Sequence, residues 1–356
     1  MGYTSYDSNY YLSLRGRLDE KDLQEIIAIG EMDRIQADFM PHPEDLAMLN
    51  EHYYSRYPQT GLRLYALGEK ADLSVLACMT NIQKLSIQTN RSVDHIEVLS
   101  QLLSLKKLQI YVDLLNNFDF IDDVPISIEQ FALSTKSKAF DLSRLTRFTN
   151  LKVLRLIRYK KNIDALAALS ELVSLNIEGV TPESLAFINT LQNLKRLKIH
   201  YGNINDFSEL YGNESITALK LFRITNLADA EIIAQLPNME AVELSWLRHI
   251  DKLPDLSEHK KLKHVLMDDM KTLTDLSGLE HCASLESFHF SVCPSIFEQE
   301  HLLPVLRNPS VRQCSVYTSS TKKNEQFRKL IKESGKINDN NNKIIRKLLY
   351  SSEFFN

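Results

Sequence analysis

A six-residue pattern of apolar and polar positions recurs along most of the chain. Residues 194–199 (Leu-Lys-Arg-Leu-Lys-Ile) are its clearest copy, with apolar residues at the first, fourth and sixth places. Copies begin 20 to 26 residues apart, at Leu62, Ile82, Leu105, Ile128, Leu151, Leu172, Leu194, Ile216, Met239, Leu262, Leu285 and Val311. Alternating side chains predict a short β-strand in each copy. A period this steady predicts a solenoid, in which each repeat buries its apolar side only against its neighbours.

The segments between these strands carry a second, shorter set of apolar residues. Examples are Asp-Leu-Ser-Arg-Leu at residues 141–145 and Asp-Leu-Ser-Gly-Leu at residues 275–279. Return segments of this length suit 3₁₀-helix or a single helical turn. The predicted fold class is therefore an α/β solenoid of about twelve repeats of 20–26 residues, with a parallel sheet on its concave face.

The two ends of the array have helical patterns. In residues 1–60 a helix is predicted from Asp19 to Ile29 and another from Pro43, which together form an N-terminal cap over the array of residues 61–320. Residues 321–337 predict a C-terminal capping helix that ends near Gly335. Residues 338–356 are a polar linker and a basic, apolar tail, which is either a second capping helix or disordered.

Composition narrows the class of protein. With 42 basic and 46 acidic residues, the net charge of −4 disfavours general binding to nucleic acid or to a membrane surface, although it allows a local basic patch. No apolar run approaches the length of a membrane span, and the first residues do not resemble a signal peptide. Four cysteines are spaced like neither a zinc site nor a disulfide framework, so we expect a cytoplasmic location.

The hexad followed by Asp-Leu-Ser-x-Leu resembles the bacterial leucine-rich-repeat family, in particular its short internalin-like and SDS22-like class. The resemblance covers residues 60–320, and the end segments are similar to a cytosolic group of such proteins without a defined activity. The family implies a right-handed horseshoe whose concave sheet binds protein. It usually has asparagine at the ninth place of the repeat, where only Asn90 conforms here. We therefore expect another route for the turn hydrogen bonds, through Asn226, Thr272 or water.

The third, fifth, seventh and eighth places of the middle repeats combine basic and aromatic residues, with acidic residues after them. Tryptophan, tyrosine and arginine are the usual anchors of protein interfaces. The candidate partner-binding residues on the concave face are Arg155, Arg158, Arg196, Lys198, His200, Tyr201, Lys220, Phe222, Arg223, Glu243, Trp246 and Asp268.

The same residues also allow a structural interpretation. Like places of adjacent repeats lie side by side, so Lys220 can pair with Glu243 across strands. Arg223 can stack on Trp246 as a structural cation–π contact. The basic candidates are here called the central basic band: Arg155, Arg158, Arg196, Lys198, Lys220 and Arg223. This band is then either a binding surface or a solvated charge ladder.

Catalytic and metal chemistry find little support in the sequence. No phosphate-binding loop, nucleophile elbow or zinc-peptidase motif occurs, so we predict no enzyme activity, no cofactor and no small-molecule substrate. His264, His289, Asp268 and Asp269 fall in adjacent repeats, but a solvated polar surface is favoured over a metal site, which needs three or four convergent ligands.

Three functional hypotheses follow. The preferred one is a protein-interaction module that binds an unidentified protein partner on its concave face. An alternative is an inhibitor or immunity-like antagonist of a toxin or enzyme. Another is a nucleic-acid binder that uses the central basic band, with Tyr201, Phe222 and Trp246 stacking on bases, which the net charge of −4 disfavours.

Overall fold

The computed structural model describes residues 2–6, 11–339 and 343–350. They form two compact units, the first ending at Leu172 and the second beginning at Val173. Each unit consists of a parallel sheet with short helical segments between its strands, so the solenoid predicted from the hexads is confirmed.

Over the residues that the structure describes, the sheet of the first unit contains eight strands. Its strand β1 pairs antiparallel with β2, and the other pairs are parallel. In spatial order the strands are β1 (Tyr3–Tyr6), β2 (Tyr11–Leu14), β3 (Arg34–Ala37), β4 (Gly61–Tyr65), β6 (Lys84–Thr89), β8 (Lys107–Val112), β9 (Gln130–Ser134) and β10 (Val153–Ile157).

In the described part of the second unit, the sheet contains seven strands, all parallel and in chain order. They are β11 (Ser174–Glu178), β12 (Arg196–His200), β13 (Ala218–Phe222), β14 (Ala241–Ser245), β15 (His264–Asp268), β16 (Ser287–Ser291) and β17 (Gln313–Val316).

The apolar places of the hexad form the core of each sheet. In the second unit, Leu197 at the fourth place is in register with Leu219, and Ile199 at the sixth place with Leu221. All four side chains are fully buried, as is Leu194 at the first place. Each buried leucine side chain contributes roughly 1.5–3 kcal/mol to folding, so the repeated pattern is the main stabilising term.

The first repeat begins three residues earlier than the hexad at Leu62 predicts. Leu62 pairs with Leu85, which holds the fourth place of its repeat, and Leu67 is exposed. The true repeat therefore has Leu62 and Leu64 at the fourth and sixth places. Further strands precede it, because β2 and β3 continue the parallel sheet through Leu12 and Ile35. The error arose because Leu62, Tyr65 and Leu67 also match the apolar spacing of a hexad.

The return segments are mostly 3₁₀-helical, as expected from their length. They are η2 (Leu73–Cys78), η3 (Ile96–Gln101), η4 (Asp119–Asp122), η5 (Leu142–Arg147), η6 (Ile163–Ala168), η7 (Ala186–Thr190), η8 (Ser208–Leu210) and η9 (Ser277–Leu279), with the short helix α3 (Ile232–Gln235) and the strands β5 (Ala71–Asp72) and β7 (Val93–Asp94).

Aspartate begins several of these segments. The carboxylate of Asp141 accepts the N–H of Ser143 at 3.0 Å, and Asp275 accepts that of Ser277 at 2.9 Å. Hydrogen bonds from the hydroxyl and N–H of these serines lower the pKa of both aspartates. The recurrent Asp-x-Ser sequence therefore forms a local side-chain-to-backbone turn at the start of the return segment, and at Asp141 it also caps the 3₁₀-helix.

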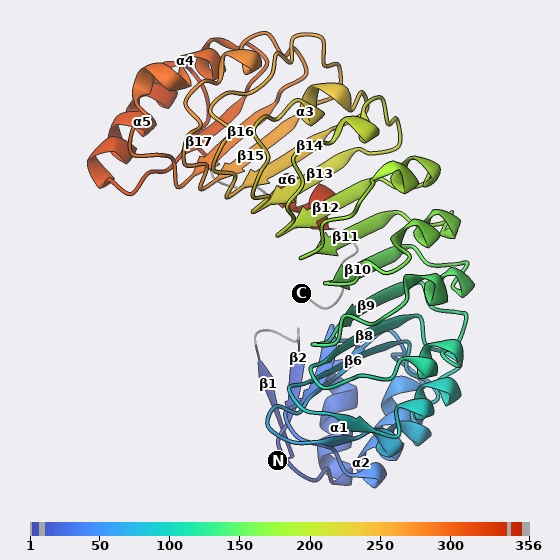
Figure 1. Cartoon of the computed structure of the whole chain (residues 1–356). Coiled ribbons are helices and arrows are strands. Elements are labelled where there is room, and N and C mark those ends of the chain that lie inside the picture. The colour runs from blue at the N-terminus through green and yellow to red at the C-terminus, as the bar shows by residue number, and fades with distance from the viewer. Residues whose placement is uncertain (1, 7–10, 340–342, 351–356) are drawn as a thin grey trace. The chain divides into compact units, whose positions relative to one another are not determined.

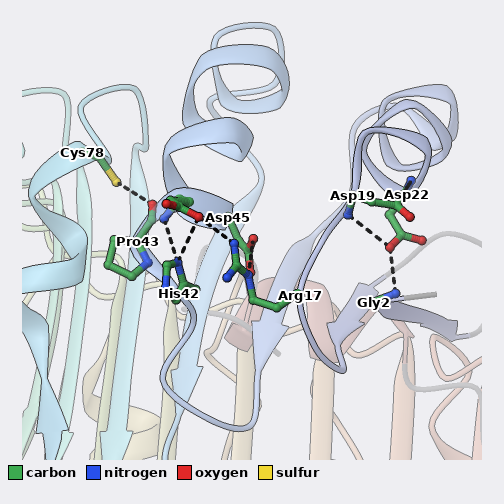
Figure 2. Close-up of polar contacts among 9 residues, drawn as sticks. Gly2, Arg17, Asp19, Asp22, His42, Pro43, Asp45 and Cys78 are labelled. Atoms are coloured by element: carbon green, nitrogen blue, oxygen red, sulfur yellow. Dashed lines mark hydrogen bonds and ion pairs between the residues drawn. The ribbon is translucent and has the colours of Figure 1, made fainter.

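Two helices cover the beginning of the first unit. Helix α1 (Glu20–Ile29) starts with a capping box between Asp19 and Asp22, and Asp22 also accepts the N–H of Gly2 at 2.8 Å (Figure 2). Helix α2 (Pro43–Leu49) continues into the π-helical turn η1 (Asn50–Tyr54). Arg17 joins the two helical regions through an ion pair with Asp45, at 3.1 Å (Figure 2).

Three helices follow β16 in the chain. Helix α4 (Gln299–Arg307) precedes β17, and α5 (Thr321–Glu333) packs against β17 at the end of the second unit. Helix α6 (Lys343–Tyr350) returns to lie against β13, β14 and β15 (Figure 1). Among the described residues, no helix is both long and apolar enough to cross a bilayer.

The turns after β11 to β15 are each built on a residue with positive φ at the eighth place. The φ angles are 67° at Gly179, 56° at Tyr201, 53° at Arg223, 58° at Trp246 and 47° at Asp269. Each N–H donates to a carbonyl at the end of the next strand, as Tyr201 does to Phe222 at 2.9 Å. This is the route that replaces the ninth-place asparagine.

Side chains of other turn residues complete these hydrogen bonds. Of the residues expected to do so, Thr272 donates its hydroxyl to the carbonyl oxygens of Arg248 and Ile250 at 3.1 and 2.8 Å. Asn90 accepts the N–H of Gly68 at 2.7 Å. The departure from the family pattern therefore leaves these turn groups hydrogen-bonded.

Val292 shows what the left-handed turn costs, because a β-branched residue there has a φ of 50°. The side chain is 51% exposed, so its replacement removes little packing. We expect Val292→Gly to raise the free energy of unfolding by roughly 0.5–1 kcal/mol, the relief of strain less the greater entropy of glycine in the unfolded chain. Denaturant titration measures the change. The matched control Ile296→Gly, at an exposed position without positive φ, should give no gain, and an equal gain in both would contradict the account.

Candidate functional site

The side chains at the third, fifth and seventh places lie on the side of each sheet opposite the buried ladder, here called the open face. The twelve candidate residues divide between the units: Arg155 and Arg158 belong to the first, and the other ten to the second. Each unit therefore has to be considered as a separate surface.

On the first unit, arginines lie over tyrosine rings. The guanidinium carbon of Arg34 is 4.9 Å from the ring centroid of Tyr11, and that of Arg63 is 4.8 Å from Tyr65. Arg155 lies 5.9 Å from Tyr111, and the exposed Arg158 donates to the carbonyl oxygen of Thr135 at 3.4 Å. None of these three tyrosines is among the twelve candidate residues, which were taken from the middle repeats.

On the second unit, four residues at the ends of successive strands form an aromatic cluster: Tyr201, Phe222, Arg223 and Trp246. The ring centroids of Tyr201 and Phe222 are 5.1 Å apart in a T-shaped arrangement, and those of Phe222 and Trp246 are 6.4 Å apart. The guanidinium carbon of Arg223 lies 5.4 Å from the Tyr201 ring and 5.0 Å from the Trp246 ring. The stacking anticipated for Arg223 thus involves two rings.

The turns hold this cluster in place. Tyr201, Arg223 and Trp246 are the eighth-place residues, whose N–H groups are bonded to the following strand. Their backbone is fixed, yet Tyr201 is 48% exposed, Arg223 is exposed, and Phe222 and Trp246 are half-buried. His200 extends the cluster, with its ring 5.7 Å from that of Phe222. A rigid, partly exposed group of rings around a guanidinium has the composition of an interface anchor.

A second group of residues forms a platform next to this cluster, made of Lys198, Ala218, Lys220, Ala241, Glu243 and Leu266. Its members occupy the third and fifth places of β12 to β15. Lys220 pairs with Glu243 at 2.7 Å, which is the cross-strand ion pair that the structural interpretation anticipated. Helix α6 lies on this platform.

The end of α6 makes the contacts with the platform. Leu349 is fully buried against Ala218 and Ala241, and Leu348 and Tyr350 pack around it with Leu266. The hydroxyl of Tyr350 donates to Glu243 at 2.9 Å and accepts a hydrogen bond from Lys220. The ammonium of Lys198 lies 3.9 Å from the centroid of the Tyr350 ring, and only 1% of this lysine is exposed.

The residues of the central basic band that belong to the second unit therefore lie in different environments. Lys198 and Lys220 lie beneath α6, whereas Arg223 belongs to the aromatic cluster and Arg196 is half-buried at a third place. Asp268 is half-buried. The pKa of its carboxyl is raised, mainly by burial and to a smaller extent by the negative charge of the nearby Asp269. The alanines of the platform and the docking of Leu349 and Tyr350 had no signal in the hexad pattern, because these residues are more than a hundred positions apart.

Two histidines of the later strands take part in hydrogen bonds across the open face. His264 Nδ1 lies 2.9 Å from the hydroxyl of Ser287, and His289 Nδ1 lies 2.8 Å from that of Ser315. Burial lowers the pKa of both, that of His289 to about 4. Within the described ranges, no group of three or more acidic, histidine or cysteine side chains is placed to hold a metal ion.

Comparison with known proteins identifies the fold. No family model matches the sequence, and no curated protein sequence matches it. Solved structures do match. An internalin (InlF) from Listeria monocytogenes has a TM-score of 0.52 and 16% identity over 81% of this chain and 86% of its own. A leucine-rich-repeat protein from Leptospira interrogans has a TM-score of 0.54 and 18% identity over 91% of this chain and 88% of its own.

These similarities show a leucine-rich-repeat solenoid of internalin-like architecture, which confirms the resemblance found in the sequence. At 16% and 18% identity they concern the fold alone. Such a fold is typically a scaffold for protein interaction.

The pKa of His289 gives a pH test of the open face. Between about 4 and the ordinary histidine value of 6.5, the unfolded chain binds more protons at this residue than the folded chain does. The free energy of unfolding therefore falls as pH drops through this range, by at most about 1.4 kcal/mol per pH unit from this group. We expect His289→Gln to lose that part of the slope.

Denaturant titrations at several pH values measure both slopes. Above pH 7.5 the pH slopes of the unmodified chain and of His289→Gln should coincide, because the imidazole of His289 is neutral in both the folded and the unfolded protein. Equal slopes of the two proteins between pH 4 and 6.5 would contradict the assigned environment of His289.

Proposed function

We propose that this chain is a protein-interaction module and that the second unit binds a partner protein on its open face, anchored by the aromatic cluster. The single observation that supports this is the cluster itself, in which Arg223 lies between the rings of Tyr201 and Trp246. Aromatic and arginine side chains at well-packed positions supply most of the binding energy of typical interfaces.

Rigidity favours binding at this place. The three eighth-place residues of the cluster are fixed through backbone hydrogen bonds to neighbouring strands, such as that from Arg223 to Ser245 at 3.0 Å. A preformed anchor loses little conformational entropy when the partner arrives, so more of the contact energy appears as affinity. The proposed mechanism is therefore shape and charge complementarity to a fixed surface, without catalysis.

The nucleic-acid alternative receives less support. Two of the lysines of the central basic band, Lys198 and Lys220, are engaged by Tyr350, and Lys220 is also paired with Glu243. A continuous basic surface that follows a phosphate backbone would need these charges accessible.

The proposed location is the cytoplasm, which suits the buried free thiols of Cys282, Cys293 and Cys314.

Affinity capture from native cytosol with the full chain as bait tests the proposal. The variant that combines Arg223→Glu and Trp246→Ala should lose its specific partner, with binding weakened by roughly 30-fold, or about 2 kcal/mol, because the central anchor is removed. Lys195→Glu is the matched control, since Lys195 is exposed at a second place, away from the open face.

The control should retain the same partner as the unmodified chain. Because Trp246 is the only tryptophan, its fluorescence gives a second readout once the partner is purified. An unchanged set of captured proteins with the double variant, or no change in Trp246 emission on binding, would refute the aromatic cluster as the anchor.

A further inference from the structure

Helix α6 has no part in closing the end of the repeat array. That end is covered by α5, whose Phe327 is 1% exposed and whose Ile331 is fully buried. Helix α6 instead lies on strands β13 to β15, ahead of β16 and β17 in the sheet (Figure 1). It occupies part of the face through which a protein of this fold would contact a partner.

The platform is shaped to receive the side chains of a helix. Ala218 and Ala241 are in register at the third places of adjacent strands, and the corresponding residues on either side of them are Arg196 and His264. Two short side chains between two long ones leave an apolar floor, and Leu349 fills it. A buried leucine is worth roughly 1.5–3 kcal/mol relative to an exposed one.

Polar groups at the edge of the floor define the residue that follows the leucine. Tyr350 donates to Glu243 at 2.9 Å, accepts from Lys220, and presents its ring to Lys198 at 3.9 Å. Phenylalanine would keep the ring contact but leave Glu243 without this donor. The platform therefore favours a helix that presents an apolar side chain and a phenol at adjacent positions.

Four other side chains of the helix that the structure describes face solvent. Lys343, Ile344, Arg346 and Lys347 are all exposed, with 58% of Ile344 accessible. Among the side chains of α6 that the structure describes, the contacts with the platform come from Leu348, Leu349 and Tyr350, a short sequence that another protein can also present on one turn of a helix.

We propose that the platform is a receptor for an amphipathic helix with two successive apolar residues followed by tyrosine, and that α6 is its intramolecular occupant, which the partner helix displaces. The receptor and its occupant stand on the contacts of α6 alone, whereas the partner's use of this site rests on the proposed protein-binding function.

A tethered occupant lowers the apparent affinity of an external helix. The dissociation constant rises by the factor by which α6 favours the seated over the released state. Flexible tethers give effective concentrations in the millimolar range, so even a weakly binding helix is seated most of the time. Release of α6 should therefore expose the platform without any change in the strands.

The test uses the full chain and, as probe, a fluorescent synthetic peptide of residues 338–356. The variant Leu349→Asp places a charge on the apolar floor and releases α6. We expect it to bind the peptide at least tenfold more tightly than the unmodified chain, as measured by fluorescence anisotropy. Ile344→Asp is the matched control in the same helix, and should bind the peptide as weakly as the unmodified chain does.

A second variant tests the location of the binding. Adding Ala241→Arg to Leu349→Asp should abolish peptide binding, because the arginine side chain fills the apolar floor. The fold should be retained, because the equivalent third place of β12 already holds an arginine, Arg196. Circular dichroism and the unfolding midpoint verify that this protein folds. Equal peptide affinity of Leu349→Asp and the unmodified chain, or binding that survives Ala241→Arg, would overturn the proposal.

The outcome is separable from that of the proposed function. Peptide binding depends on the platform and leaves the aromatic cluster intact, whereas the capture experiment depends on Arg223 and Trp246. With the captured partner, Leu349→Asp should retain several times more protein than Ile344→Asp does. Equal retention would contradict displacement of α6 by that partner. The peptide result would then still bear on the platform, and the capture result on the aromatic cluster.

Discussion

The buried ladder of apolar residues at the fourth and sixth places is the constraint on which the rest of this structure depends. Residues such as Leu197 and Leu219 must stay in register to remain out of water, because a slip of one residue would turn them toward the open face. The same register fixes the residues between them. Ala218 comes beside Ala241, and Lys220 beside Glu243, as a consequence of where the leucines lie.

The turns transmit this order to the edge of the sheet. Once the strand is fixed, the chain reverses through a left-handed residue at the eighth place, and its N–H bonds to the next strand. Positions that in another protein would favour glycine or asparagine here hold Tyr201, Arg223 and Trp246. Strained backbone often marks a functional site. In this protein the strain coincides with the aromatic cluster of the second unit.

Much of this could be predicted from the sequence, and the reasons for success and failure are physical. Hexads in register revealed the solenoid, and like places of adjacent repeats led to the pairing of Lys220 with Glu243 and the stacking of Arg223 on Trp246. Leu62 was misplaced because two apolar spacings overlap there, and β3 was missed because its apolar stretch is short. The docking of Tyr350 on Glu243 is a contact across 107 residues, and no local pattern signals such a contact.

Helix α6 covers two of the central basic residues, Lys198 and Lys220. In the sequence Lys198 and Lys220 stand among the best candidates for contact with a partner, yet both lie against the ring of Tyr350. The chain itself supplies the first ligand of this surface. A partner would therefore meet the aromatic cluster first and gain the platform only by exchange with α6.

Hydrogen exchange of the backbone amides in residues 343–350 tests the seating of α6 most directly. In the full chain these amides should exchange at least tenfold more slowly than in the free peptide of the same sequence, because local opening must undo the burial of Leu349 and the hydrogen bonds of Tyr350. Exchange at the rate of the free peptide would contradict the seated helix.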